Sequence, residues 1–333
     1  MVSLKRLFSA VGILLAVGAP LPGAGATDEG LHYASILEGC DILRSGFRPS
    51  AARSIWLQSS GNRGSAAMAD GKDGKERGWS SSAGCTLATP RLLGIPLSVS
   101  AEVFGFRRWG EMERAEADDL SQKWDGTGGG GELFLRVLGN DLRLIAAGER
   151  VKSSEREDDG LALRSDVLHL GACLAHRLIP IGPLALGLEL SALSTRIATK
   201  DSAIALKSGD GESLFGKKFG SVANWRAAPG IFLAFSGLGH VGCRAGGRWV
   251  WDFGSRRPTF SSLVPHFPID GDIADAWNAV REKGKTGPKS GYGEMELALS
   301  VGLGHRLSAE LDAIAYCGKR RGARIFLTAA RDF

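Results

Sequence analysis

The stretch EMELALSV, residues 294–301, alternates large apolar side chains with charged or small ones. Its large apolar positions are Met295, Leu297, Leu299 and Val301. Successive side chains of a β-strand point to opposite faces, whereas an α-helix would need apolar residues three and four positions apart. The stretch therefore predicts a strand with one apolar and one polar face.

The same period of two recurs along most of the chain, starting at residue 52. It predicts strands near residues 52–60, 79–89, 95–108, 131–138, 142–152, 165–177, 184–196, 225–236, 241–254, 291–302, 307–317 and 322–333. Twelve strands make the even number that single-chain antiparallel barrels require. The first strand is weakly patterned, and two further strands before it would make fourteen. Ten and fourteen strands are therefore kept as alternatives.

The connections between these strands alternate between short and long. The short ones lie near residues 90–94, 139–141, 178–183, 237–240 and 303–306, and the long ones near 61–78, 109–130, 153–164, 197–224 and 255–290. The long ones are rich in glycine, serine and charged residues. One contains the glycine run 128–131, and another a predicted short helix at 273–283. Short turns at one end and long polar loops at the other are typical of a transmembrane β-barrel.

The last predicted strand resembles the C-terminal strand by which bacterial outer-membrane β-barrel proteins are recognised for assembly. Its apolar face carries Ala323, Ile325, Leu327, Ala329 and Phe333. Phe333 would be the assembly signal, although Arg331 departs from the apolar residue usual at that position. The resemblance covers residues 52–333. It implies an all-β, antiparallel, up-and-down transmembrane barrel in the outer membrane of a Gram-negative bacterium, with the barrel assembly machinery as a partner.

Aromatic residues next to the long loops resemble the girdle of such barrels at the membrane interface. They are Trp79, Trp225, Trp249 and Tyr292. The structural alternative is a soluble exported β-sandwich, in which these residues would be ordinary core or rim aromatics.

The N-terminus, residues 1–26, has the order of a secretory signal peptide. A short basic stretch precedes an apolar run at residues 7–17, and a small-x-small cleavage site, AGA, follows at 24–26. The apolar run is too short to span a membrane as a helix. Residues 27–51, whose apolar positions have helical spacing, are predicted to form an N-terminal periplasmic segment or a plug. Residues 52–333 would form the barrel.

Composition excludes several classes of protein. The chain has 333 residues, of which 44% are hydrophobic and 23% charged, with 41 basic residues against 36 acidic ones. It is too apolar and too evenly charged for a disordered or collagen-like chain. The net charge of +5 includes Lys5 and Arg6 of the signal peptide. No basic stripe remains, so we expect no nucleic-acid partner.

The polar faces of the predicted strands would line the lumen with charges of both signs. The predicted lumen-lining residues are Glu102, Glu132, Arg136, Arg143, Glu189, Arg244, Arg248, Asp252, Glu294, Glu296, Glu310, Asp312 and Arg324. They could form salt bridges between strands, because buried charges must be paired. Alternatively, they could form a constriction that selects solutes by charge, with the acidic C-terminal strands facing Arg244 and Arg248 across the lumen.

These features favour a porin-like passive channel for small polar solutes, surrounded by outer-membrane lipid. A non-conducting structural or surface-display barrel is one alternative, and an outer-membrane lipid hydrolase is another. The hydrolase would use His169 with Ser165 or Ser191. The sequence lacks the His-x-Ser-Asn-like cluster of outer-membrane phospholipases and lipid A deacylases, so we expect no enzyme. It also shows no zinc-ligand spacing, and we expect no metal and no cofactor.

The five cysteines, at positions 40, 85, 173, 243 and 317, are odd in number. The strand pattern turns Cys85, Cys243 and Cys317 toward lipid, where they would act as small apolar residues. Cys173 turns toward the lumen instead. A Cys40–Cys173 disulfide that pins the N-terminal segment in the lumen is one alternative in the oxidising periplasm.

Overall fold

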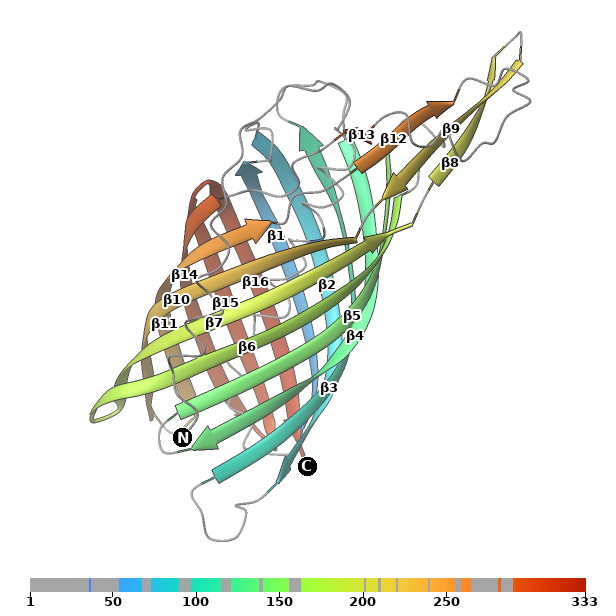
Figure 1. Cartoon of the computed structure of the whole chain (residues 1–333). Helices are drawn as coiled ribbons and strands as arrows, with labels where there is room; N and C mark the ends of the chain where they lie inside the picture. The colour runs from blue at the N-terminus through green and yellow to red at the C-terminus, as the bar shows by residue number, and fades with distance from the viewer. Residues whose placement is uncertain are drawn as a thin grey trace.

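The protein folds as a closed antiparallel β-barrel (Figure 1). The computed structural model describes residues 36, 54–67, 73–89, 97–114, 121–137, 140–155, 163–200, 202–208, 211–219, 221–238, 240–254, 259–264, 281–282 and 290–333. Twelve strands in these ranges form the barrel, and its first strand pairs with its last along thirteen residue pairs. The predicted all-β, up-and-down barrel is confirmed.

Each barrel strand is hydrogen-bonded to its two neighbours in the barrel order. The barrel strands are β1 (Ser54–Ala67), β2 (Asp73–Thr89), β3 (Leu97–Arg114), β4 (Ser121–Val137), β5 (Asn140–Glu155), β6 (Leu163–Ile181), β7 (Leu184–Thr199), β10 (Ser221–Leu238), β11 (Val241–Gly254), β14 (Ser290–Gly304), β15 (Leu307–Gly318) and β16 (Arg320–Asp332). One end of the barrel, the short-turn end, holds the start of β1, the end of β16 and the connections 90–96, 138–139, 182–183, 239–240 and 305–306. The opposite end, the loop end, holds the connections 68–72, 115–120, 156–162, 200–220, 255–289 and 319.

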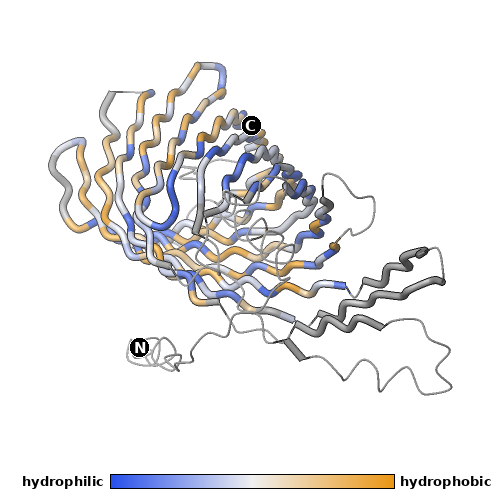
Figure 2. The backbone as a smooth tube through the Cα atoms, turned by 90° about the horizontal axis from the view of Figure 1, so that it is seen from above, coloured by the Kyte–Doolittle hydropathy of each residue, from blue (hydrophilic) through white to orange (hydrophobic). Residues whose placement is uncertain are grey.

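Strand β14 shows which side chains face outward and which face inward. Met295 and Leu297 are 59% and 56% exposed on the outer wall, whereas Glu294 faces inward and is 2% exposed. Hydrophilic and hydrophobic positions alternate in the same way along the other barrel strands (Figure 2). A soluble sandwich would bury its apolar face and would not leave a continuous apolar wall exposed. The inverted arrangement is the one that a barrel surrounded by lipid requires.

The strands extend farther toward the loop end than the apolar pattern predicted. The predicted loops 61–78 and 109–130 are mostly strand, and the connections shrink to 68–72 and 115–120. The glycine run 128–131 therefore lies in β4 and not in an outer loop. Backbone hydrogen bonds continue between strands past the apolar zone, where outward side chains need not be apolar. Periodicity alone could not find these residues.

Glycines of β4 leave room for aromatic side chains inside the barrel. A Cβ atom on the inward-facing Gly128 would overlap the backbone oxygen of Gly148 and lie 2.6 Å from Cζ of Phe106, whereas one on Gly105 would meet only a backbone oxygen at 3.8 Å. We expect Gly128→Ala to lower the free energy of unfolding by about 1–3 kcal/mol, because overpacking displaces neighbouring atoms. The control Gly105→Ala should change it by less than about 0.5 kcal/mol. Guanidinium titrations in detergent micelles measure both values, and equal losses would contradict this expectation.

A second sheet of four strands is built from two of the loop-end connections, and it lies beyond the loop end of the barrel (Figure 1). Its strands are β8 (Ser202–Ser208), β9 (Gly211–Phe219), β12 (Thr259–Val264) and β13 (Arg281–Glu282). The helix predicted at 273–283 is wrong at Arg281 and Glu282, which extend this sheet. The rest of that helix lies outside the described residues. A strand of two residues is too short to show a period, so the sequence analysis took this region for loops. In the described part of the chain, we find no helix with the length and apolar character needed to cross a membrane.

Aromatic residues of the outer wall lie toward the loop end. Trp79, Trp225 and Trp249 are exposed there, at positions that suit a girdle. Tyr292 is different, because it points inward, is 2% exposed and packs edge-on against Tyr316. The prediction that Tyr292 belongs to the aromatic girdle is therefore wrong. The parity of the strand, and not the residue type, decides which way a side chain points.

Candidate functional site: the barrel interior

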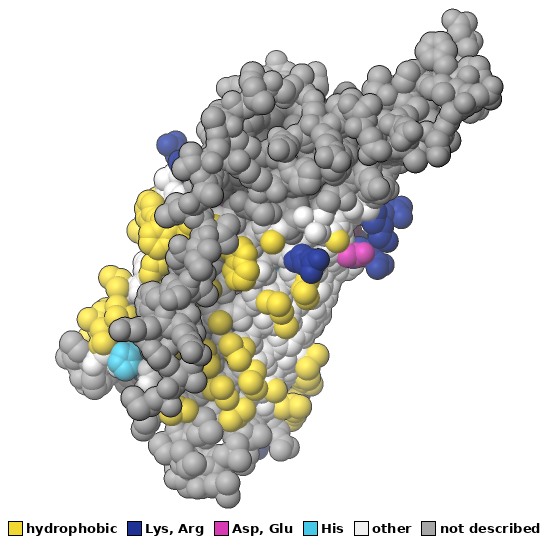
Figure 3. Space-filling model, in the orientation of Figure 1, with side chains coloured by type: hydrophobic (Ala, Val, Ile, Leu, Met, Phe, Trp, Pro, Cys, Tyr) yellow, Lys and Arg dark blue, Asp and Glu magenta, His cyan; other side chains and the backbone are white. Residues whose placement is uncertain are grey.

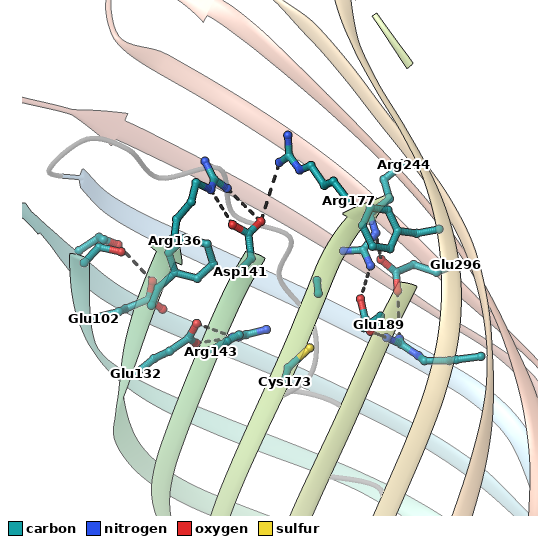
Figure 4. Close-up of a pocket in the computed structure, with 16 residues that line it drawn as sticks. Glu102, Glu132, Arg136, Asp141, Arg143, Cys173, Arg177, Glu189, Arg244 and Glu296 are labelled. Carbon is teal, nitrogen blue, oxygen red and sulfur yellow. Dashed lines mark hydrogen bonds and ion pairs between the residues drawn. The ribbon is translucent and has the colours of Figure 1, made fainter. Parts of the chain in front are cut away.

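The residues assigned to the lumen occupy strand positions whose side chains are buried or half-buried. Most of them surround a cavity of about 90 Å³ in the half of the barrel toward the short-turn end (Figure 4). Five lie outside the cavity lining on other parts of the inner wall, namely Asp252, Glu294, Glu310, Asp312 and Arg324. Asp252 accepts a 2.7 Å hydrogen bond from Arg226, and the guanidinium of Arg324 lies 5.8 Å from the ring of Phe326.

The cavity, which we name the polar chamber, is lined by five arginines and five carboxylates, together with small and aromatic side chains. The charged ones are Glu102, Glu132, Arg136, Asp141, Arg143, Arg177, Glu189, Arg244, Arg248 and Glu296. They come from β3, β4, β5, β6, β7, β11 and β14 and point toward one another (Figure 4). Equal numbers of the two signs leave the chamber close to neutral.

On strands β4 to β6, arginines are held by carboxylates of neighbouring strands. Arg143 donates two hydrogen bonds to Glu132, the longer of them 2.7 Å. Arg136 donates two to Asp141, at 2.6 and 3.2 Å, and Arg177 lies 3.8 Å from the same carboxylate. The predicted lumen set omitted Asp141 because it was assigned to a short turn. In the structure, β5 already begins one residue earlier, and the alternation of β5 extended by one residue would have found it.

On strands β7, β11 and β14, five charges form one network. Arg248 donates to Glu294 at 2.5 Å and also lies 3.1 Å from Glu189 and 3.0 Å from Glu296. Arg244 is hydrogen-bonded to Glu189 and lies 3.8 Å from Glu296.

The predicted opposition of these charges across the lumen is wrong. Strands β11 and β14 are adjacent in the barrel, and Arg248 is the register partner of Glu294. The charges therefore pair along the wall, as charges removed from water require.

Nearer the loop end, a buried chain of polar side chains links four strands. Arg108 of β3 donates two hydrogen bonds to Glu149 of β5, and both side chains are 1% exposed. His169 of β6 places Nε2 3.6 Å from Glu149 and Nδ1 3.1 Å from the hydroxyl of Thr195 on β7. The sequence analysis missed Arg108 and Glu149. The parity of their strands could have found them, because both share a face with residues assigned to the lumen.

The structure does not bring together the side chains considered for a hydrolase. The hydroxyl of Ser165 lies 2.8 Å from that of Thr199, and Ser191 donates to the backbone oxygen of Ala228 at 3.4 Å. His169 is 1% exposed inside the barrel, away from the outer wall that lipid would touch. Within the described ranges, no group of three or more histidine, cysteine or acidic side chains is placed to hold a metal ion.

One residue of the N-terminal segment, Ile36, is described, and it lies inside the barrel. It is helical, is 0% exposed, and belongs to one buried cluster with Val151, Val167 and Ile197. These three side chains point inward from β5, β6 and β7, within a few residues of the loop end. Ile36 therefore occupies the half of the lumen that lies beyond the polar chamber.

The cysteines divide between the two faces of the wall. Cys173 lines the polar chamber as a free thiol (Figure 4), and Cys40 lies outside the described residues, so their disulfide stays a prediction. Cys85 and Cys317 are free thiols and exposed, and Cys243 is free and half-buried.

The apolar outer wall, the ion-paired inner wall and the closure of twelve strands define a β-barrel of the bacterial outer-membrane class. Three solved structures of this class are similar to the chain. The translocator domain of the autotransporter NalP from Neisseria meningitidis has a TM-score of 0.64 and 12% identity, over 91% of this chain and 99% of that one. The transport unit of the autotransporter AIDA-I from Escherichia coli has a TM-score of 0.62 and 10% identity, over 92% and 98%.

The third similar structure is the beta domain of the Bordetella autotransporter Brka, with a TM-score of 0.58 and 13% identity, over 85% of this chain and 100% of that one. At these identities the likeness establishes the fold. No protein-family model matches the sequence, and no curated protein sequence is significantly similar to it.

Proposed function

We propose that the protein is exported through its N-terminal signal peptide to the outer membrane, where it is a small-solute channel closed at rest by its own N-terminal segment. The packing of Ile36 against Val151, Val167 and Ile197 carries this proposal, because it puts this one residue of the segment inside the lumen. The apolar outer wall supports the membrane location. Short turns face the periplasm in barrels of this class, so the loop end would face the cell exterior.

The polar chamber supports passage of small polar solutes once the segment has moved. Its arginines and carboxylates are fixed by one another and offer hydrogen-bond donors and acceptors along the inner wall. Because the two signs are balanced, zwitterionic and neutral polar solutes suit the chamber better than ions of a single charge. A barrel of twelve strands is narrow, so a helix inside it leaves little free cross-section.

A second candidate, a surface-display barrel, is favoured by the direction of the chain. Strand β1 begins at the short-turn end with Ser54, whereas Ile36 packs toward the loop end. Ile36 and Ser54 thus lie toward opposite ends of the barrel, as expected if the chain between them passes through the lumen. The similar structures are described as the translocator domain, the transport unit and the beta domain of autotransporters, a description that belongs to those proteins.

Single-channel recording in planar bilayers tests the closed channel. We expect the full mature chain to be silent and Ile36→Asp to give stepwise conductance. A buried carboxylate without a partner is strongly disfavoured among three aliphatic side chains. We therefore expect the N-terminal segment to leave its position in the lumen. The conservative variant Ile36→Val should remain silent.

Stepwise conductance of the same size in the unaltered protein would contradict closure by the segment. If all three proteins fold, as shown by their shifted migration in unheated gels, yet stay silent, the channel proposal fails. Antibody access to an N-terminal tag on intact cells would then favour the display candidate.

A further inference from the structure

Basic side chains gather on the outer wall of β1 to β6, close to the loop end. We name the following exposed residues the basic band: Arg63, Lys75, Arg77, Arg107, Lys123, Arg150, Lys152 and Arg164. Four acidic residues share this zone, namely Glu111, Glu113, Asp125 and Asp166. Farther toward the short-turn end, outward positions of the same strands carry aliphatic residues such as Leu57, Leu133 and Leu144. The band therefore has an excess of positive charge at one height of the barrel.

The basic band borders the aromatic residues of the outer wall. Trp79 and Trp109 are register partners on β2 and β3, both are exposed, and each lies two positions from a member of the band. Basic side chains also lie beside the hydrophobic zone in the space-filling view, toward the loop end (Figure 3). Exposed tryptophans mark the level of the lipid headgroups in membrane proteins. The band would therefore meet the headgroups of the outer leaflet.

Two pairs within the band place like charges directly opposite each other. Arg63 of β1 is the register partner of Arg77 of β2, and Lys152 of β5 is the register partner of Arg164 of β6. All four side chains are exposed on the outer wall. Like charges opposite each other on neighbouring strands are destabilising. An anionic group bound between the members of each pair would remove that repulsion.

The first of these pairs lies at a hollow in the barrel surface. The hollow has a volume of about 200 Å³, and its charged lining consists of Arg63, Lys75 and Arg77 together with Glu76, Glu111 and Glu113. Three cationic side chains on two neighbouring strands can surround the oxygens of one phosphate ester. Glu76 is paired with Arg320 at 3.3 Å, whereas Glu111 and Glu113 limit the charge of the hollow and disfavour a second anion beside the first.

We propose that the basic band binds a phosphorylated lipid of the outer leaflet, with its phosphate groups at the Arg63/Arg77 pair and at the Lys152/Arg164 pair. The band adjoins the apolar wall, so its occupant has both phosphate groups and acyl chains, which a free anion lacks. Arg107 and Arg150 are already held by Asp125 and Asp166, at 2.6 and 3.0 Å. Arg77 and Lys152 also lie opposite Glu111 and Asp125 in the register. An anion would therefore bind on the other side of each residue, between Arg63 and Arg77 and between Lys152 and Arg164. The inference rests on the proposed outer-membrane location.

Lipid binding by the full mature chain in dodecyl-maltoside micelles tests this inference. The probes are fluorescent lipid A and the same lipid with its phosphates removed, and the readout is the anisotropy-derived Kd. We expect Arg63→Ala/Arg77→Ala to weaken lipid A binding about 20-fold, or about fivefold per residue. Binding of the dephosphorylated lipid should be unchanged. Glu113→Gln should strengthen lipid A binding, because it removes a repelling carboxylate from the hollow.

Two controls separate binding from damage to the fold. Arg331→Ala removes an exposed arginine at the short-turn end and should change the Kd by less than about twofold. In micelles without lipid A, Arg63→Ala should leave the barrel as stable as the original or more stable, because its register partners are Arg77 and Ala323 and the repulsion from Arg77 is gone.

Equal weakening for both lipids, or none for either, would overturn the inference. Complete displacement of lipid A by millimolar inorganic phosphate would show a site for free anions and would also overturn it. The band lies on the outer wall and Ile36 on the inside, so the conductance experiment succeeds or fails independently of this one.

Discussion

Arg108→Met is expected to lower the free energy of unfolding by about 3–5 kcal/mol, the cost of removing one partner of a buried ion pair. The guanidinium of Arg108 and the carboxylate of Glu149 are both 1% exposed. Without the arginine, the carboxylate would stay inside the barrel with His169 at 3.6 Å as its remaining ionisable neighbour. Guanidinium titration of the barrel in detergent micelles measures the loss.

The adjacent residue provides a matched control for this prediction. Arg107 has a side chain that is 64% exposed and is paired with Asp125 at 2.6 Å on the outer wall. Arg107→Met should cost less than about 1 kcal/mol, because exposed ion pairs contribute little. Equal losses for the two variants would show that burial does not set the strength of these pairs.

Arg248→Met is the second large effect, and we again expect a loss of about 3–5 kcal/mol. Arg248 is shared by three carboxylates, those of Glu189, Glu294 and Glu296. Removing it leaves Arg244 within 4 Å of two of them, Glu189 and Glu296. The same titration measures the loss.

A second substitution shows whether charge or shape causes this loss. Glu294→Gln in the Arg248→Met background should recover part of the stability, because it removes the charge of a buried carboxylate that no longer faces Arg248. In an open channel carrying Ile36→Asp, Arg248→Met should also shift the reversal potential toward cation selectivity. If Glu294→Gln adds a further loss, the network does not act through its charges.

The fold could be predicted because the membrane imposes a strict rule on one face of each strand. Residues 294–301 alternate because lipid requires apolar side chains outside and the interior accepts polar ones. This rule applies only to the part of each strand that lies in the membrane. The first part of β4, residues 121–130, reads SQKWDGTGGG and is still strand, but nothing outside it demands apolar residues. The strand boundaries toward the loop end were therefore missed.

The sequence could predict which single residues face the lumen, but not which of them pair with one another. Parity placed Arg248 and Glu294 on the inner face, but their pairing follows from strand order and register, which the sequence does not display. The basic band was missed for the same reason. Each strand contributes only one or two residues to the basic band, so the sequence shows no basic stripe. The residues come together only when the strands pair in the barrel. Ile36 is the one described residue of the predicted N-terminal segment or plug, so the plug stays a prediction.

The seam between β1 and β16 imposes an order on biogenesis. Inside the barrel, Gln58 donates a hydrogen bond of 3.0 Å to Thr328, a residue 270 positions later in the chain. Contacts of such sequence separation form late and slowly, so both sheet edges remain unpaired until the last strand has arrived. A chain interrupted anywhere before β16 is thus an open sheet with two reactive edges, and not a smaller barrel.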